Sequence, residues 1–204
     1  RNRDWSPEAW AADSCGSPLV ARKDGANPVA DAPAPVAGDF HKLGLAPATL
    51  AAVERAGYTV PTPVQAGFIP RALQGIDVMG QARTGTGKTA AFVLPILERV
   101  SEPSERGGTG PRALVLVPTR ELAVQVRDEF EKLAHGSRVH CVAVYCGKPI
   151  RGQIDKLAKR PAVVVGTPGR VLDHMSRGTI QLGALEIVTL DEADRMLDIG
   201  FRPD

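Results

Sequence analysis

The sequence has 204 residues, of which 43% are hydrophobic and 24% are charged, a balance that suits one globular domain with an appendage. Its net charge is +2, so the chain as a whole lacks the basic excess of many nucleic-acid-binding proteins, and a basic surface would have to be local. No apolar run approaches the ~20 residues of a membrane span, and the first residues lack the apolar core of a signal peptide. We therefore expect no membrane contact and a cytoplasmic location.

The three cysteines show no CxxC spacing. This argues against a zinc site and against a disulfide framework, and it favours a reducing compartment. We expect Cys141 and Cys146 to be small, partly buried residues.

Residues 1–38 form a lead rich in proline, alanine, glycine and aspartate, a composition typical of a disordered tail. In the alternative interpretation, Trp5 and Trp10 dock this lead on the domain or on a partner. Residues 39–204 form the expected ordered domain. Because the chain opens on Arg1 and stops soon after an acidic motif, we expect it to be a fragment of a longer protein.

From residue 40 onward, stretches with helical spacing alternate with short apolar runs. We expect helices over 47–56, from Pro63 onward, and over 89–100, 121–134, 150–159 and 170–177, and strands over 77–80, 113–117, 139–145, 162–165 and 185–190. The runs at 113–117 and 162–165 contain no polar residue, as in strands that helices cover on both faces. The alternation predicts an α/β fold with a mostly parallel sheet flanked by helices, in which ligands bind at the carboxyl ends of the strands.

A glycine-rich segment connects the expected strand 77–80 to the expected helix 89–100, and we call it the phosphate loop: Ala82, Arg83, Thr84, Gly85, Thr86, Gly87, Lys88 and Thr89. Its glycines allow successive N–H groups to point at an anion, and the helix N-terminus adds a positive dipole end. Lys88 can reach the β- and γ-phosphates of a nucleotide, and the Thr89 hydroxyl can ligate Mg²⁺. The structural alternative is a turn rich in glycine and threonine, with a solvent-exposed lysine and no ligand.

An acidic motif, Asp191-Glu192-Ala193-Asp194, follows the apolar run Ile187-Val188-Thr189-Leu190 directly. Carboxylates at the end of a buried strand are costly unless they face a cation, which beside a phosphate loop is Mg²⁺. Asp191 suits the metal, and Glu192 suits the orientation or activation of an attacking water. The alternative is an acidic turn without a ligand.

Gln65 falls in the first turn of the helix that Thr62 and Pro63 begin. Its amide offers one donor and one acceptor, which match the N6 and N7 edge of adenine. An exposed capping glutamine is the alternative.

Taken together, these motifs resemble the first RecA-like domain of a DEAD-box RNA helicase. Asp191–Asp194 is the sequence that names this family, and the phosphate loop resembles its motif I, in which alanine at the position of Ala82 is normal. Gly57–Gln65 resembles the Q motif, with Phe40 upstream at the place of an aromatic that packs on adenine. Residues 118–123 resemble motif Ia, 167–170 resemble motif Ib, and Gln153 stands at the glutamine that follows the family's Gly-Gly pair. Cys146-Gly147 departs from that pair at its first position.

The resemblance implies a RecA-like P-loop NTPase domain that binds ATP and Mg²⁺. It assigns catalytic roles to Lys88, Asp191 and Glu192, metal ligation to Thr89 and Asp191, and nucleotide binding to Phe40, Gln65 and the phosphate loop. It also implies an RNA surface that contacts the sugar-phosphate backbone without reading sequence, built from Pro118, Thr119, Arg120, Gly147, Thr167, Gly169 and Arg170. For the two arginines, salt bridges at helix starts are the structural alternative.

The family's second RecA-like domain is missing from this sequence. We therefore expect the ATP-binding half of a monomeric, ATP-dependent RNA helicase, whose parent protein couples hydrolysis to local duplex unwinding. The alternative is a non-catalytic fragment that binds nucleotide or RNA without turnover. A small-molecule kinase would need an acceptor pocket and a lid, and no stretch of the sequence indicates either.

Overall fold

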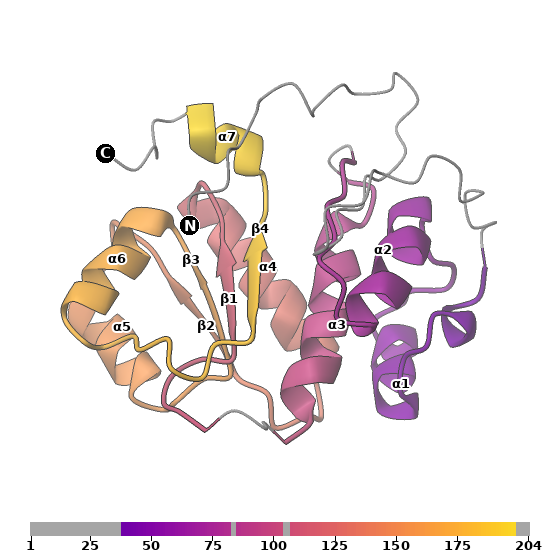
Figure 1. The fold of residues 1–204 in the computed structure, drawn as a ribbon, viewed down its shortest axis with the longest axis horizontal. Coiled ribbons are helices and arrows are strands. Elements are labelled where there is room, and N and C mark those ends of the chain that lie inside the picture. The colour runs from indigo at the N-terminus through magenta and orange to yellow at the C-terminus, as the bar shows by residue number, and fades with distance from the viewer. Residues whose placement is uncertain (1–37, 83–84, 104–106, 199–204) are drawn as a thin grey trace, which may run out of the picture.

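The computed structural model describes residues 38–82, 85–103 and 107–198 (Figure 1). The lead 1–37, with Trp5 and Trp10, lies outside the described residues, and so do Arg83 and Thr84 of the phosphate loop. The described elements are, in chain order, η2 (Phe40–Lys42), α1 (Pro47–Arg55), α2 (Pro63–Leu73), α3 (Lys88–Ser101), β1 (Ala113–Leu116), α4 (Arg120–Leu133), β2 (Cys141–Val144), α5 (Ile150–Leu157), β3 (Val163–Gly166), α6 (Pro168–Ser176), β4 (Ile187–Leu190) and α7 (Ala193–Asp198).

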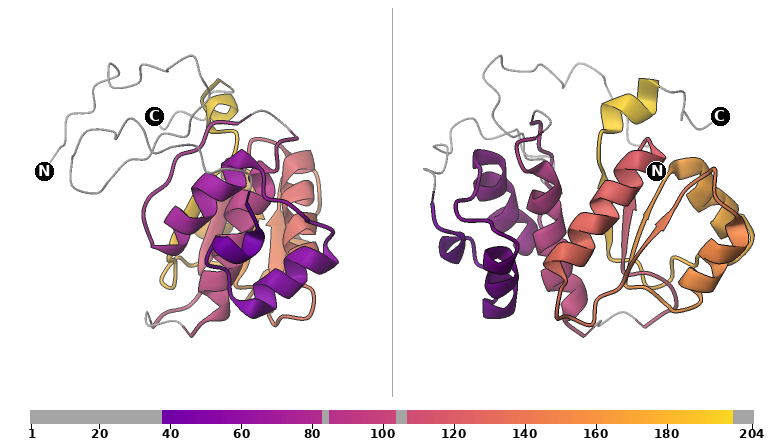
Figure 2. Two further views of the ribbon diagram at one scale, coloured as in Figure 1. Left: turned by 90° about the vertical axis from the view of Figure 1, so that its right-hand side faces the viewer. Right: turned by 180° about the vertical axis from the view of Figure 1, so that it is seen from behind.

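In the described part of the chain, four parallel strands form one sheet in the order β2-β3-β1-β4. β1 and β3 occupy its centre, and their Val115, Val163 and Val165 side chains are completely buried. The predicted parallel α/β fold is therefore confirmed, with helices on both faces of the sheet (Figures 1 and 2).

Two apolar cores hold the layers together. The larger core packs α3 and α4 on one face of the sheet, and it extends outward through Val53 of α1 and Ile69 of α2. The smaller core packs α5 and α6 on the other face, around Val164 and Val171. Residues 90–97 of α3 are all buried, as the apolar composition of this helix predicts. α1 and α2 thus form an outer layer against α3 (Figure 1).

Three expectations about strands and burial are corrected. Residues 77–80 have no strand assignment, and in the described sheet β4 has β1 on one side and no strand on the other. β4 is an edge strand rather than a buried one, because Val188 and Leu190 are 57% and 56% exposed. Cys141 is partly buried as predicted, whereas Cys146 is exposed because it lies in the turn after the edge strand β2.

Candidate nucleotide and RNA site

The carboxyl ends of the strands meet in one row at a single edge of the sheet. Leu116 pairs with both Gly166 and Leu190, and Gly166 also pairs with Val144. The residues that follow these strand ends are Tyr145, Val117, Thr167 and Asp191, and three of them continue the ladder through backbone hydrogen bonds. Segments that are far apart in the sequence therefore come together at the edge where ligands bind in parallel sheets.

The described part of the phosphate loop leads into the N-terminus of α3. Gly85 and Gly87 have φ of +81° and +84°, a left-handed conformation that L side chains rarely adopt. Gly87 is also the N-cap of α3, and a Cβ there would lie 2.5 Å from Nε2 of Gln65. Only glycine fits this position, and Lys88 and Thr89 follow it in the first helical turn.

Gln65 is 1% exposed and joins this loop to the start of α2. Its Oε1 accepts a hydrogen bond from the Thr62 N–H at 2.9 Å, and the Thr62 hydroxyl lies 3.4 Å from the Gln65 N–H, which completes a capping box. Its Nε2 donates to the Gly87 carbonyl at 3.1 Å. The alternative of an exposed capping glutamine is therefore wrong about exposure, although the capping itself is present.

Asp191 lies within the electrostatic reach of Lys88. Burial raises the pKa of the Asp191 carboxyl, and the positive charge of Lys88 opposes that rise. Glu192 has a φ of +53°, a strained conformation for a side chain of its size, and its carboxylate pairs with Arg195 at 3.3 Å. Such strain is a feature of functional sites when the surrounding structure maintains it.

The donor set around Asp191 suits a nucleotide-bound Mg²⁺. Among the described residues, no group of three or more His, Cys, Asp and Glu side chains is placed to hold a metal by itself. Mg²⁺ commonly takes one or two protein ligands and completes its shell with waters and phosphate oxygens. The half-buried Asp191 carboxylate, which lies near the phosphate-loop lysine, fits that pattern, so the residues present are compatible with the ion.

Phe40 lies in the apolar core rather than at an open surface. It is 4% exposed, and its ring meets the Tyr58 ring edge-on, with the centroids 6.2 Å apart. Tyr58 is held in turn by a hydrogen bond from its hydroxyl to Glu129 at 2.6 Å. In this conformation Phe40 offers almost no surface to an adenine ring, and its role in base binding stays a prediction.

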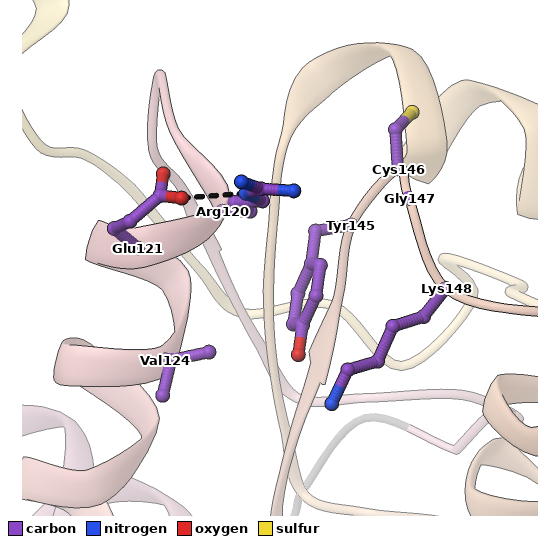
Figure 3. Close-up of a pocket in the computed structure, with 7 residues that line it drawn as sticks. All are labelled: Arg120, Glu121, Val124, Tyr145, Cys146, Gly147 and Lys148. Carbon is purple, nitrogen blue, oxygen red and sulfur yellow. Dashed lines mark hydrogen bonds and ion pairs between the residues drawn. The ribbon is translucent and has the colours of Figure 1, made fainter.

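The exposed part of the predicted RNA surface centres on Arg120 (Figure 3). Thr119 caps α4 by accepting a hydrogen bond from the Leu122 N–H at 3.2 Å, and Arg120 begins the helix. A pocket of about 470 Å³ adjoins it, which we call the Arg120 pocket. It is lined on one side by Arg120, Glu121 and Val124 of α4, and on the other by residues 145–148.

Arg170 differs from Arg120 in its surroundings. Its side chain is only 13% exposed, and it lies 3.9 Å from the Asp173 carboxylate. Its Nη1 donates to the Lys148 carbonyl at 3.3 Å. The Thr167 hydroxyl is also buried, without a hydrogen-bond partner in the described structure. The backbone of residues 167–170 lies at the common edge, where Pro168 is partly buried and Gly169 is exposed. The Arg170 guanidinium, by contrast, interacts with other residues of the chain.

Two polar residues near this edge were not assigned any role from the sequence. Lys148 lines the Arg120 pocket, and the only sequence signal for it is a basic residue beside Gly147. His174 is 0% exposed on α6, and its spacing of three residues from the core residue Val171 could have indicated burial. The structure brings both close to Gln153, as described below.

Comparisons with known proteins agree with the motifs. A family model described as DEAD/DEAH box helicase matches residues 62–204. The chain is 49% identical over 165 residues to the DEAD-box ATP-dependent RNA helicase CshA of Bacillus cereus, an alignment that covers 81% of this chain and 31% of that protein. CshA of Geobacillus kaustophilus matches at the same identity, with 34% of its length covered. The chain thus spans about a third of the length of these curated relatives.

Comparison with solved structures also finds RNA helicases and DEAD-box proteins. The RNA helicase Prp28 from Chaetomium thermophilum bound to ADP superposes with a TM-score of 0.73 at 41% identity, over 80% of this chain and 40% of that one. A DEAD-box protein from Methanococcus jannaschii superposes with a TM-score of 0.71 at 42% identity, over 81% of this chain and 45% of that one. In the described residues, no helix is both long and apolar enough to cross a membrane.

Proposed function

The chain belongs to the DEAD/DEAH box helicase family, and on that premise we propose that it is the ATP-binding half of an ATP-dependent RNA helicase. The observation that carries the proposal is the common edge of the sheet. The phosphate-loop lysine, a half-buried carboxylate after β4 and an exposed arginine at the start of α4 converge there from separate parts of the chain.

The nucleotide would bind with its phosphates at the N-terminus of α3. Backbone N–H groups there and the Lys88 ammonium would neutralise the phosphate charge. Gln65 and Phe40, both buried in the described structure, are the proposed contacts to the base. Thr89 and Asp191 would hold Mg²⁺, which when bound supplies positive charge to the phosphate oxygens. Glu192 would orient the attacking water and accept its proton.

The RNA would run along the exposed part of the same edge, past Thr119 and Arg120, Gly147 and Gly169. Backbone N–H groups and arginine contact phosphates without reading bases, so binding would be independent of sequence and sensitive to salt. In the parent protein a second RecA-like domain would close on both ligands, and hydrolysis would then release the clamped, locally unwound RNA. We propose that the parent acts as a monomer in the cytoplasm.

The test is the binding of a fluorescent ATP analogue in the presence of Mg²⁺. Lys88→Ala should weaken the binding about tenfold or more, because it removes a charge-assisted contact to the phosphates. Lys42→Ala, which removes an exposed lysine from η2, is the matched control and should bind as the wild type does. Equal affinity of Lys88→Ala and the wild type would refute the assignment of the nucleotide site.

A further inference from the structure

The turn formed by residues 145–148 lies between β2 and α5 and carries Gly147 and Lys148. β2 is at the edge of the described sheet, so no neighbouring strand lies on its outer side. The backbone N–H and carbonyl of Tyr145, the first residue after this strand, therefore need another partner if they are to stay paired.

Gln153 of α5 is that partner, and it is only 6% exposed. Its Oε1 accepts from the Tyr145 N–H at 3.2 Å, and its Nε2 donates to the Tyr145 carbonyl at 3.1 Å. Nε2 also lies 3.4 Å from the Lys148 carbonyl. One amide thus takes the place of a neighbouring strand at the beginning of the turn and contacts its end as well.

Groups from α6 and from the residues after it brace this arrangement from the buried side. His174 Nε2 lies 3.4 Å from Gln153 Oε1, the same oxygen that accepts from the Tyr145 N–H. The Thr179 hydroxyl lies 2.8 Å from the other ring nitrogen. Arg170 adds its hydrogen bond to the Lys148 carbonyl. The conformation of the turn is therefore determined by buried side chains.

The opposite side of the turn forms one wall of the Arg120 pocket, and two cations face this pocket. Lys148 is exposed, with its Nζ 5.7 Å from the centroid of the Tyr145 ring, and Figure 3 shows the two side chains next to each other. Arg120 is also exposed, and a Cβ at Gly147 would lie 3.5 Å from its Nη1. The Cys146 side chain points away from Tyr145 (Figure 3).

One acid shares the pocket. Glu121 accepts a hydrogen bond from Nε of Arg120 at 2.5 Å, and within the described structure this is the only hydrogen bond or ion pair of that guanidinium. Both terminal nitrogens of Arg120 consequently remain available for a second anion. The pocket thus offers two cations and the face of a tyrosine ring, a combination that suits a phosphodiester and its adjoining ribose.

We propose that Lys148, in the Arg120 pocket, is a phosphate contact in addition to those expected from the sequence, and that Gln153 is its buried positioning residue. The proposal rests on the proposed function, because it assumes that RNA runs along this edge. It adds that the position of Lys148 depends on the amide of Gln153, through the hydrogen bonds at both ends of the turn.

The experiment measures binding of a fluorescent single-stranded oligouridine to the 204-residue chain by anisotropy over a range of salt concentrations. Lys148→Ala should weaken binding about fivefold to tenfold and lower the salt slope by about 0.7, as expected for one lost phosphate contact to a single strand. Gln153→Glu keeps the size of the side chain but replaces the Nε2 donor with an oxygen that repels two carbonyls, and it should weaken binding to a similar extent. The RNA affinity of the double variant should lie within about twofold of the affinity of the weaker-binding single variant, since both changes act on one contact.

Three controls accompany these variants. Lys159→Ala removes an exposed lysine just after the C-terminus of α5, and Gln74→Glu makes the same chemical change as Gln153→Glu at the exposed end of α2, so both should bind RNA as the wild type does. Affinity for the fluorescent ATP analogue should change by less than about twofold in every variant, which separates an RNA effect from unfolding.

Wild-type RNA affinity in Lys148→Ala, an exposed change that leaves the fold intact, would overturn the proposed phosphate contact of Lys148. Wild-type affinity in Gln153→Glu, or fully additive losses in the double variant, would overturn the positioning role. An intact chain that binds the ATP analogue but no RNA at all would instead refute the RNA part of the proposed function.

Discussion

The amide of Gln65 connects the start of α2 to the phosphate loop through hydrogen bonds at both of its ends. A residue expected to face a ligand is thus buried, and it contacts the same glycine that permits the left-handed turn before α3. The base-reading role and the structural role are compatible, since an amide oxygen and an NH₂ group can each form a second hydrogen bond. Adenine binding at this residue would therefore be coupled to the conformation of the phosphate loop.

Gln65→Glu should weaken binding of ATP and GTP alike, by about tenfold, because a buried oxygen would then face the Gly87 carbonyl where Nε2 donates at present. The measurement is a titration with fluorescent ATP and GTP analogues. If the variant lost only the preference for ATP while retaining its affinity for the triphosphate, the link to the phosphate loop would have no energetic importance.

Glu192→Gln in the parent protein should bind ATP and RNA normally but hydrolyse ATP much more slowly. The change is nearly isosteric, leaves Asp191 in place and removes the group that is proposed to accept a proton. Single-turnover hydrolysis and analogue binding separate the two effects, with Asp155→Asn on the exposed face of α5 as the control. Loss of ATP binding with an intact fold would show that Glu192 has a different role.

His174 should make the stability of the domain depend on pH. Burial lowers the pKa of this histidine below its ordinary value of 6.5, and the charge of Arg170 lowers it further. At a pH between the His174 pKa of the folded chain and that of the unfolded chain, the unfolded chain binds more protons. The contribution of neutral His174 to folding stability is therefore complete above about pH 6.5, and it is lost as the pH falls through the pKa of the folded chain. Urea unfolding should show a steeper loss of stability toward pH 5 in the wild type than in His174→Gln. If the stability of the wild type and of His174→Gln depended on pH in the same way, the assignment of this pH dependence to His174 would be wrong.

At the scale of elements, β1, β4 and the end of α3 are joined by Arg112. Its guanidinium pairs with Glu186 at 2.8 and 3.1 Å, and it also donates to the carbonyls of Arg99 and Val100. Both charged side chains are nearly buried, at 14% and 11% exposure. One residue thus pairs with the segment before β4 and satisfies carbonyls at the end of α3 that have no partner within the helix.

Arg112→Met should destabilise the domain by about 3 kcal/mol, because it leaves the Glu186 carboxylate buried with weaker compensation. Arg177→Met, which breaks an exposed pair with Asp173 on α6, should cost less than about 1 kcal/mol. Denaturant unfolding of the two variants provides the comparison. Similar losses in both would mean that burial does not strengthen the Arg112 pair.

At the scale of the whole molecule, the described residues present one side of a site that the proposed mechanism closes with a second domain. The common edge of the sheet is open, and β4 exposes two apolar side chains at the edge of the sheet. An open site retains its contacts to base and phosphates but is not shielded from water, which weakens electrostatic stabilisation of a transition state.

The 204-residue chain by itself should therefore bind ATP and Mg²⁺ weakly and show no RNA-stimulated hydrolysis. An arginine supplied from a second domain is typically worth ~10³ to 10⁵ in kcat. Steady-state ATPase assays with and without saturating single-stranded RNA, against the longer parent protein, measure the difference. Strong stimulation of the short chain, at a rate near that of the parent, would contradict the two-domain mechanism.

The sequence by itself determined the parallel α/β fold, the left-handed glycines before α3 and the meeting of the strand ends at one sheet edge. These features depend on local properties, namely apolar periodicity, glycine spacing and the order of elements along the chain, and parallel pairing then aligns the strand ends. Predicted ends of helices and strands differ from the observed ones by a few residues, because capping and fraying decide them.

The tertiary structure alone decided which polar side chains face the ligand edge and which face inward. Arg120 and Arg170 both lie in the first turn of a helix, yet one is exposed and the other bonds to a neighbouring turn. Gln65 and Phe40 are buried, and residues 77–80 have no partner strand in the described sheet. Each outcome depends on neighbours distant in sequence, because burial and strand pairing are properties of the packed molecule, and no local pattern encodes them.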